Sequence, residues 1–472
     1  MIKKRGTSNF LIPAICCLCL FSLCGCHFPF GRSTSSDHAQ QRSPKLPCVV
    51  LALPATGPHA QLAARIRQGA ELAQKEMLAN GINVRLENIN TEASDWIERL
   101  EQLPPWCSTV GGPIQQDKYA QARKAGLLER RTFFTFLARL GAGEEGKLAW
   151  RFFPGPKDQV NALLNFTVND LNIRSYGVFY PDDEYGRQMV RMLANALDER
   201  HMSLERASYH GADPASWAAA AKPLIRPAYP EGGKNPVPQT LFEAIFLPDS
   251  WKNTDLLMNS LLYNGEDRLV VMGPSLWEQA LNGRKLASAE KYSLAVFPSP
   301  WDPSKKTKSG NQHASFWEAL GFDFLNFAAS LEIDSRPASS EVASRARRHE
   351  DKIRAIAPII WGQDGVATQR LYLFQPSAQG MKKLNTQQFQ EARRQRYEEA
   401  ALRFQDGFSE VPVPEGDIDG ESGLPKAAPA SSPQDASGLS APIPARATGQ
   451  PAAPALGVVP HPSYKLRLPA RQ

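Results

Sequence analysis

Short apolar runs and amphipathic stretches alternate along residues 48–300 of this chain. Residues 49–53 are uniformly apolar and end at Pro54, which predicts a strand buried on both faces of a sheet. A turn at 55–58 follows, and apolar residues then recur from Leu62 to Met77 with the spacing of one helix face. The chain thus opens with a β-turn-α unit, and sheets built from such units bind ligands at the carboxyl ends of their strands.

The same alternation continues through the next two hundred residues. Amphipathic helices are predicted near 95–103, 115–127, 160–171 and 189–197, and strands at 82–88, 107–111, 132–138, 176–180, 203–209, 242–247 and 269–272. Strands that alternate with helices form mainly parallel sheets. Two such sets, divided near Trp150, predict an α/β fold with two lobes, each a mainly parallel sheet flanked by helices.

The amino-terminal residues follow another pattern. Lys3, Lys4 and Arg5 precede an apolar run at 10–23, which predicts a signal peptide over residues 1–25. The alternative is an uncleaved membrane anchor, but the run is shorter than the ~20 residues that span a bilayer. Residues 23–26 resemble lipoprotein cleavage sites, so Cys26 would become the lipidated first residue and 26–46 a flexible tether. His27 after the cysteine implies the outer rather than the inner membrane.

The carboxyl-terminal part is polar. Residues 386–405 predict a charged helix with few apolar positions. Residues 406–472 are rich in proline, alanine, serine and glycine, and too poor in apolar side chains to offset the entropy of ordering them. We therefore predict a disordered tail, which is either an inert extension or a segment that reaches a cell-wall partner.

Charge and cysteine content exclude two classes of function. The net charge is +6, and three of the positive charges lie in the predicted signal peptide, so a surplus of +3 remains. Nucleic-acid binding requires a denser basic face. Five of the seven cysteines lie at or before Cys26, which leaves only Cys48 and Cys107 and argues against a zinc site.

Two motifs suggest chemistry that their context does not support. Residues 141–146 match G-x-G-x-x-G, but Glu144 and Glu145 would face a pyrophosphate and no helix opens after the last glycine. Residues 182–184 are consecutive acids in a loop, which cannot easily face one substrate bond, so solvated charge is the better interpretation. We predict no catalytic residue, no cofactor and no metal.

Several segments, taken in order, resemble the type I periplasmic binding proteins of the leucine-binding family. The turn at 56–58 stands where that family has Ser-Gly-Pro, residues 183–186 form its D-x-Y-G loop, and residues 316–323 and 359–374 resemble its later helix start and closing hairpin. The resemblance covers about residues 48–380. It implies one lobe of about 48–150 and 298–335 and a second of about 151–297 and 352–380.

The resemblance has an implication for the two remaining cysteines. The family places the strands that begin at Cys48 and Cys107 side by side, and an exported chain meets an oxidising compartment. The two residues therefore form either a disulfide or a pair of buried free thiols.

The resemblance also implies a ligand site between the lobes, at Thr56, Gly57, Arg139, Tyr185 and Ser275. In the family, hydroxyls and amides after the third and fourth strands hold the carboxylate of an amino acid, and an acid holds its ammonium group. This chain has no serine after its third strand and has Ser275 in place of the acid. A desolvated zwitterion needs both charges matched, so a free branched-chain amino acid fits poorly. Arg139 is either a residue that points into the cleft, where it would favour an anionic or carboxylate-bearing ligand, or a surface arginine.

Two functions follow from these expectations. One is a non-catalytic, lipid-anchored protein that regulates or scaffolds a cell-wall synthase, as the resemblance to penicillin-binding-protein activator lipoproteins implies. The other is the substrate-binding lipoprotein of an ABC transporter, for a carboxylate or an amino-acid derivative. The expected partners are therefore a cell-wall synthase or a small ligand, and the membrane through the lipid on Cys26, but no nucleic acid.

Overall fold

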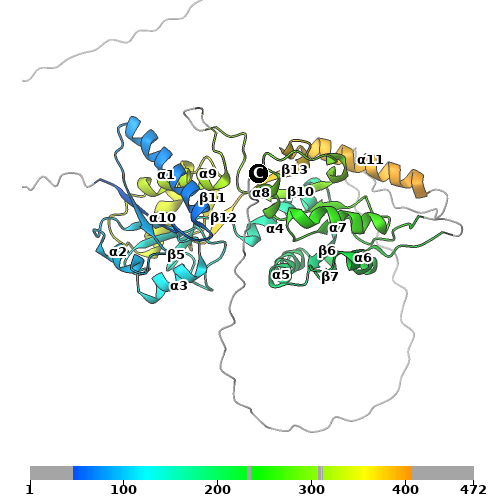
Figure 1. Ribbon diagram of the computed structural model, residues 1–472, viewed down its shortest axis with the longest axis horizontal. Coiled ribbons are helices and arrows are strands. Elements are labelled where there is room, and N and C mark those ends of the chain that lie inside the picture. Colours follow the sequence, from blue (N-terminus) through cyan, green and yellow to red (C-terminus); the bar gives the residue numbers. More distant parts are fainter. Residues whose placement is uncertain (1–45, 231–234, 307–309, 311, 405–472) are drawn as a thin grey trace, which may run out of the picture. The chain divides into compact units, whose positions relative to one another are not determined.

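The computed structural model describes residues 46–230, 235–306, 310 and 312–404 (Figure 1). The predicted signal peptide, the lipidation site Cys26, the tether up to residue 45 and the predicted tail at 406–472 lie outside the described residues.

The first sheet has five strands, all parallel, in the order β2-β1-β3-β4-β5. The strands are β1 (Cys48–Leu53), β2 (Arg85–Asn90), β3 (Thr109–Gly111), β4 (Thr132–Thr135) and β5 (Ala149–Arg151). Its helices are α1 (Ala60–Ala79), α2 (Trp96–Gln102) and α3 (Gln116–Lys124), joined from later in the chain by α9 (Phe316–Ser330), α10 (Ser339–Arg348) and the short η4 (Glu350–Lys352). A hairpin of β11 (Ile359–Trp361) and β12 (Ala367–Gln369) follows η4.

The second sheet has seven strands in the order β14-β13-β10-β9-β8-β6-β7. The five parallel strands are β6 (Ser175–Pro181), β7 (Ser203–Tyr209), β8 (Ala244–Phe246), β9 (Val270–Met272) and β10 (Ala295–Ser299). The two antiparallel strands are β13 (Tyr372–Ser377) and β14 (Gly380–Lys383). The helices of this half are α4 (Pro156–Asn165), the π-helix η1 (Phe166–Asp170), α5 (Glu184–Asp198), η2 (Pro214–Ser216), α6 (Trp217–Ile225), α7 (Trp251–Tyr263), α8 (Leu276–Leu281), η3 (Ala289–Tyr292) and α11 (Thr386–Phe404).

Strand β1 is buried on both faces, as its apolar run predicts. All six of its residues are buried. Because successive side chains of a strand point to opposite faces, Val49 and Leu51 join one apolar cluster while Val50 and Ala52 join the other. The mainly parallel α/β fold class predicted from the sequence is confirmed.

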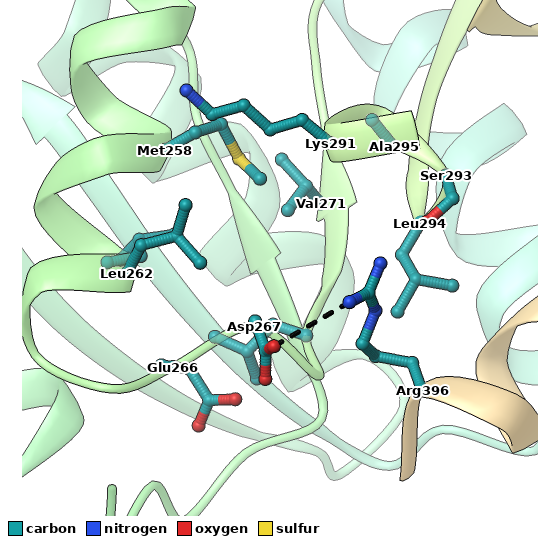
Figure 2. A pocket seen from close by; sticks show the side chains of 12 residues that line it. Met258, Leu262, Glu266, Asp267, Val271, Lys291, Ser293, Leu294, Ala295 and Arg396 are labelled. Carbon is teal, nitrogen blue, oxygen red and sulfur yellow. Dashed lines mark ion pairs between the residues drawn. The ribbon is translucent and has the colours of Figure 1, made fainter. Parts of the chain in front are cut away.

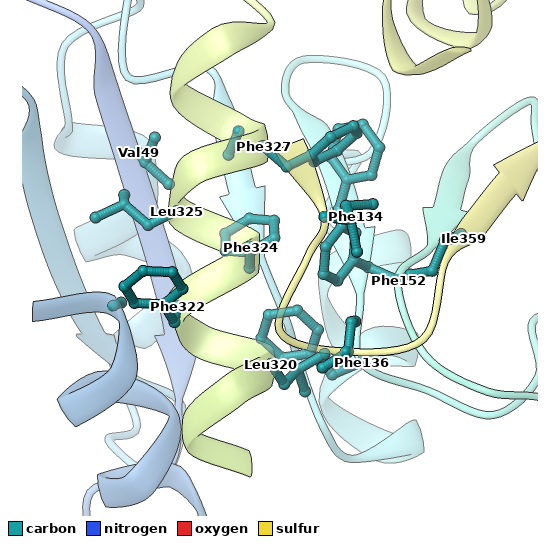
Figure 3. Packing of buried hydrophobic residues seen from close by; sticks show 14 of the residues in the cluster. Val49, Phe134, Phe136, Phe152, Leu320, Phe322, Phe324, Leu325, Phe327 and Ile359 are labelled. Carbon is teal, nitrogen blue, oxygen red and sulfur yellow. The ribbon is translucent and has the colours of Figure 1, made fainter. Parts of the chain in front are cut away.

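Helices α1 and α9 pack closely on one face of the first sheet (Figure 1). A side chain at Gly69 would overlap the carbonyl oxygen of Glu318, and one at Gly321 would overlap that of Ile66. These two glycines therefore let the helix backbones touch. Phe324 and Phe327 of α9 join a cluster of aromatic rings (Figure 3).

The aromatic cluster joins α9 to the strands of the first sheet. The ring of Phe327 lies 5.2 Å from those of Phe134 and Phe152, and it stacks on Trp361 at 4.9 Å. Edge-to-face and offset contacts of this kind add to the free energy of burying the rings. Trp361 comes from β11, so the hairpin after η4 is part of this core.

The boundary predicted for the second lobe differs from the structure. Residues 352–380 were assigned to that lobe, yet Ile353, Ile359 and Ala367 pack in the apolar core of the first sheet. Asp323 of α9 explains the difference, because its buried carboxylate accepts hydrogen bonds from three consecutive backbone N–H groups at 354–356, at 2.7–2.9 Å. This part of the chain is thereby fixed to α9.

Helix α11 is an integral part of the second half, whereas the sequence predicted a separate charged helix. Its buried residues are Phe389, Arg393, Tyr397, Ala400 and Phe404. The ring of Phe389 packs edge-on against Phe166 at 5.2 Å, and Arg393 forms an ion pair with Glu243 at 2.8 Å. The charged residues that dominate the sequence of α11 cover its outer face.

Candidate functional site

The five predicted ligand residues lie at the carboxyl ends of parallel strands in the two sheets. Thr56 and Gly57 follow β1, and Arg139 follows β4, which places these three at one edge of the first sheet. Tyr185 follows β6 and Ser275 follows β9, at the corresponding edge of the second sheet. This is where ligands bind in open α/β sheets.

The loop after β1 is exposed and held by one asparagine. Thr56 and Gly57 are both exposed, and Gly57 has a φ of 79°, a conformation that favours glycine. Asn90, at the end of the neighbouring strand β2, accepts hydrogen bonds from the N–H groups of Ala55 at 2.8 Å and Glu92 at 3.1 Å. The hydroxyl of Thr56 is thus presented on a fixed turn.

The loop after β3 is closed to a ligand carboxylate at its first two residues. The N–H of Gly112 donates to the carbonyl oxygen of Phe134 at 2.9 Å, and Pro113 has no N–H. A side chain at Gly112 would overlap the carbonyl oxygen of Ala52, and its φ of 102° also favours glycine. The one N–H group at these two positions, that of Gly112, is therefore used within the sheet and is not available to a ligand.

The carboxylate of Glu92 holds the side chain of Gln115, which belongs to the same loop. Glu92 accepts a hydrogen bond from the Gln115 amide at 2.9 Å and pairs with Lys118 at 3.1 Å. Burial works to raise the pKa of Glu92, but these two partners outweigh it and hold the pKa below its usual value. Gln115 is thereby turned toward β2 and α3.

Arg139 and Tyr185 differ in their surroundings. Arg139 is exposed, and its guanidinium takes part in no hydrogen bond or ion pair described for residues 46–404. Tyr185 is half-buried, because its ring packs against the apolar cluster that contains Met189 and Val190 of α5. The acids beside it are structural: Asp183 caps α5 by accepting the N–H of Gly186 at 2.7 Å, and Asp182 pairs with Arg187 at 2.6 Å.

The loop that matches G-x-G-x-x-G has a buried carboxylate at its centre. The Oε2 atom of Glu144 accepts hydrogen bonds from the Tyr119 hydroxyl at 3.0 Å and from Gly141 N–H at 3.1 Å, and Oε1 pairs with Arg123 at 2.6 Å. Burial and the bond to Glu144 raise the pKa of Tyr119. A phosphate approaching this loop would meet the Glu144 carboxylate.

Ser275 precedes a helix that carries a buried acid. Its N–H donates to the Gln159 side chain of α4 at 3.0 Å, and α8 begins at the next residue. Glu278, in the first turn of α8, is 5% exposed. Burial alone raises the pKa of Glu278 to about 7.

Glu278→Gln is expected to stabilise the protein above pH 7 by about 1–2 kcal/mol. The folded state keeps the Glu278 proton up to a pKa of about 7, whereas a freely solvated glutamate has a value of 4.5. The native protein should therefore lose stability as pH rises from about 4.5 to 7, and glutamine removes that loss. The gain is less than the full shift because a buried amide also loses its water.

Urea unfolding of the two proteins at several pH values between 4 and 8 measures this effect. Glu290→Gln, at an exposed glutamate of η3, is the control and should leave the pH profile unchanged. A stability difference between native protein and Glu278→Gln that does not vary with pH would refute the prediction.

A small pocket lies at the other end of the second sheet (Figure 2). Leu269 and Leu294, which directly precede β9 and β10, line it together with Met258 and Leu262 of α7, and its volume is about 180 Å³. Arg396 of α11 pairs with Asp267 at its rim, at 3.8 Å. Small-molecule sites usually enclose about 300–1,000 Å³, so we do not assign a ligand to this pocket.

The five parallel strands of each sheet, the returning α9 and the closing antiparallel strands define a type I periplasmic-binding-protein fold. Solved structures show the same fold. Full-length LpoA of Haemophilus influenzae is 13% identical over 72% of this chain and 59% of its own length, with a TM-score of 0.52. The C-domain of the same LpoA, a regulator of PBP1A, is also 13% identical, over 72% of this chain and all of the domain, with a TM-score of 0.50.

A transport protein is equally similar. A putative branched-chain amino acid ABC transporter from Rhodospirillum rubrum is 12% identical over 72% of this chain and all of its own length, with a TM-score of 0.52. The chain covers less than two thirds of full-length LpoA. No family model and no curated protein sequence matches it. At these identities the structures establish the fold and leave both proposed functions open.

Within 46–404, no helix has both the length and the apolar content needed to cross a bilayer. Across the same residues, no group of three or more histidine, cysteine, aspartate or glutamate side chains could hold a metal ion.

Proposed function

We propose that this chain is a non-catalytic, lipid-anchored protein of the periplasm that regulates or scaffolds a cell-wall synthase. The observation that carries the proposal is the loop after β3. Gly112 donates its N–H to the sheet and Pro113 has none, so neither amide can bind the carboxylate of an amino acid. With Ser275 where the leucine-binding family has an acid, the ammonium group would also lack its partner.

A second observation supports the same proposal. Receptors that close on a ligand do so through a few hinge residues that change their backbone angles. In this chain the two crossing segments, at 152–155 and 367–369, are tied together by two hydrogen bonds: Arg151 donates to the carbonyl oxygen of Ala367, and Gln369 N–H donates to Asp158 at 3.0 Å. A junction fixed in this way suits a scaffold better than a receptor that must close on a small molecule.

Anchoring and location belong to the same proposal. Cys26 would carry the lipid, and His27 after it points to the outer membrane. The protein should sediment with membranes, and Cys26→Ala should release it to the soluble fraction. Sedimentation that persists in Cys26→Ala would contradict the anchor.

The alternative is a substrate-binding lipoprotein for a small carboxylate or an amino-acid derivative. One observation favours it: the exposed guanidinium of Arg139 and the exposed hydroxyl of Thr56 stand at the same edge of the first sheet. Such a pair could bind a carboxylate without an N–H group from Gly112 or Pro113.

A thermal-shift screen of the full chain in detergent separates the two functions. A ligand at ~100 times its Kd stabilises the folded state by ~2.7 kcal/mol, which moves the midpoint clearly. We expect no shift with free amino acids or small carboxylates, and saturable binding of a purified bifunctional cell-wall synthase. A shift abolished by Arg139→Ala or Tyr185→Ala, and kept by Arg347→Ala at an exposed arginine of α10, would overturn the regulator. Absence of both effects would overturn both functions.

A further inference from the structure

An exposed apolar surface lies at the amino-terminal edge of the first sheet. Leu46, Leu78 and Ile82 are 49%, 62% and 50% exposed. Leu46 comes shortly before β1, Leu78 is in the last turn of α1, and Ile82 follows that helix. The start of β1 and the end of α1 lie on the same side of the first half (Figure 1). We call this surface the entry face, because the predicted tether joins the described chain at Leu46.

Backbone hydrogen bonds bring the three side chains to one place. Arg85 N–H donates to the carbonyl oxygen of Pro47 at 2.8 Å, which holds the residues before β1 beside those before β2. Ile82 N–H donates to the carbonyl oxygen of Met77 at 2.9 Å, which holds the same loop against the last turn of α1. Leu46 therefore lies next to the loop that carries Ile82.

The apolar core does not account for Leu78. Met77 packs against the core of the first sheet, and the next residue of an α-helix is rotated from it by about 100°. Ile82 is partly accounted for, because an apolar residue after a helix that ends in this way commonly packs on the last turn. The buried residues of α1 lie on one side of the helix and are Ala63, Ile66, Gly69, Ala70 and Ala73.

Trp106 adds an aromatic ring beside the entry face. It precedes Cys107, and the disulfide to Cys48 holds that residue at the start of β1, with the two Cα atoms 4.7 Å apart. The Trp106 side chain is half-buried and packs on the apolar cluster below it. Tryptophan is enriched where proteins meet the headgroup layer of a membrane, since its ring is largely apolar and its N–H is polar.

Charged side chains around the entry face are mostly paired with one another. Arg85 pairs with Glu87 at 2.6 Å, and Arg130 pairs with Glu101 at 2.5 Å. Paired charges lose less than lone charges when water is removed from a surface. Lys75, near the end of α1, is exposed, and a lysine can lay its alkyl chain along an apolar surface while its ammonium group reaches a phosphate.

We propose that the entry face docks on the bilayer that holds the lipid of Cys26, an inference that rests on the lipid anchor of the proposed function. The tether meets the first half at this face, so contact with the bilayer requires no path around the domain. Residues 26–46 can span at most about 70 Å, and the anchor therefore keeps the face at a high effective concentration beside the lipid. Three apolar side chains then suffice, although they would not hold the unanchored chain of Cys26→Ala.

Docking would orient the first half relative to the membrane. The strands of its sheet are parallel, so their carboxyl ends all lie at the edge opposite the entry face. A strand of six residues such as β1 spans roughly 20 Å. Thr56 and Arg139 would then face away from the bilayer, where a synthase or a ligand in the periplasm can reach them.

A fluorescent label at position 82 tests the docking. In the processed chain Cys26 carries lipid and Cys48 is joined to Cys107, so Ile82→Cys supplies the one thiol that an environment-sensitive dye can label. The lipidated full chain is placed in vesicles of phosphatidylethanolamine with a minority of phosphatidylglycerol. We expect the emission to move to shorter wavelength and to be quenched by spin-labelled lipid. The same dye on Leu402→Cys, at a leucine of α11 that is 68% exposed, should show neither effect.

Substitutions in the entry face should release the label from the lipid. We expect Leu46→Gln/Leu78→Gln to lower the ratio of docked to undocked chain about tenfold, which corresponds to 1.4 kcal/mol. Leu256→Gln/Leu402→Gln, at two exposed leucines of the second half, is the matched control and should leave the ratio unchanged. All four leucines are at the surface, so equal thermal midpoints in detergent should show that the variants fold.

Three outcomes would overturn the docking, and they separate it from the anchor. Equal emission from the labels at 82 and 402, in vesicles that retain the protein, would refute the docking and leave the anchor intact. A shift at 82 that requires an added cell-wall synthase rather than lipid would assign the entry face to a protein partner. A native chain that does not float with the vesicles would refute the anchor and, with it, the docking.

Discussion

Alanine in place of Arg151 is expected to lower the free energy of unfolding by about 3–5 kcal/mol. The Arg151 guanidinium is 8% exposed and pairs with Asp158 at 2.8 Å and Glu145 at 3.2 Å. It also donates to the carbonyl oxygens of Phe153, at 2.6 Å, and Ala367. The substitution leaves the Asp158 carboxylate, 4% exposed, buried without its cation. Urea unfolding at pH 7 measures the loss.

An exposed ion pair of similar length provides the control for Arg151. Arg187 and Asp182 are 2.6 Å apart but 45% and 44% exposed, so Arg187→Ala should cost no more than about 1 kcal/mol. The double variant Arg151→Met/Asp158→Leu should cost less than the two single substitutions added together, because neither charge of the pair is then left buried without its partner. A loss below 1 kcal/mol for Arg151→Ala would show that the network contributes little.

Reduction of the disulfide between Cys48 and Cys107 is the second large effect. The two residues are joined in the structure, with Cα atoms 4.7 Å apart and 59 positions apart in sequence. A cross-link that closes a loop of this length removes chain entropy from the unfolded state, worth about 4 kcal/mol by the usual chain-entropy model. We therefore expect dithiothreitol to move the urea midpoint of the native protein to a clearly lower concentration.

The matched control is the double variant Cys48→Ala/Cys107→Ala. It should unfold near the midpoint of the reduced native protein, and dithiothreitol should not change it. Both cysteines are at most 5% exposed. Alanine is therefore used rather than serine, whose hydroxyl would be costly to bury. A native midpoint that is the same with and without reductant would show that the two thiols are free in solution.

The sequence predicted the bounds of three strands closely. The bounds of β7 are those of the predicted strand at 203–209. Strand β1 begins one residue before its predicted start, and β6 extends one residue beyond its prediction at each end. The shorter strands β3 and β8 were predicted too long, because buried side chains such as Cys107, Phe242 and Leu247 flank the residues that pair in the sheet. The apolar pattern of the sequence follows burial, and buried residues extend beyond those that pair in the strands.

The sequence did not reveal contacts between distant segments. Arg151 binds Ala367 across 216 positions, and nothing in either segment specifies the other. The buried face of α11 was present in the sequence, since Phe389, Tyr397 and Phe404 recur with helical spacing. Arg393 interrupts this apolar face, and the sequence alone does not distinguish a buried arginine from an exposed one. The π-helix η1 has no sequence signature, so it was also missed.

The placement of α11 has a consequence for the order in which the second half can fold. Phe389 completes the cluster that contains Phe166 and Val178, so this core lacks a part until synthesis has passed residue 389. At 5–20 residues per second, the ribosome needs roughly ten to fifty seconds to go from Phe166 to Phe389. Throughout that interval the nascent second half has an uncovered apolar surface. A message that ends shortly after β14 would make this state permanent, and its product should be a substrate for chaperones and proteases.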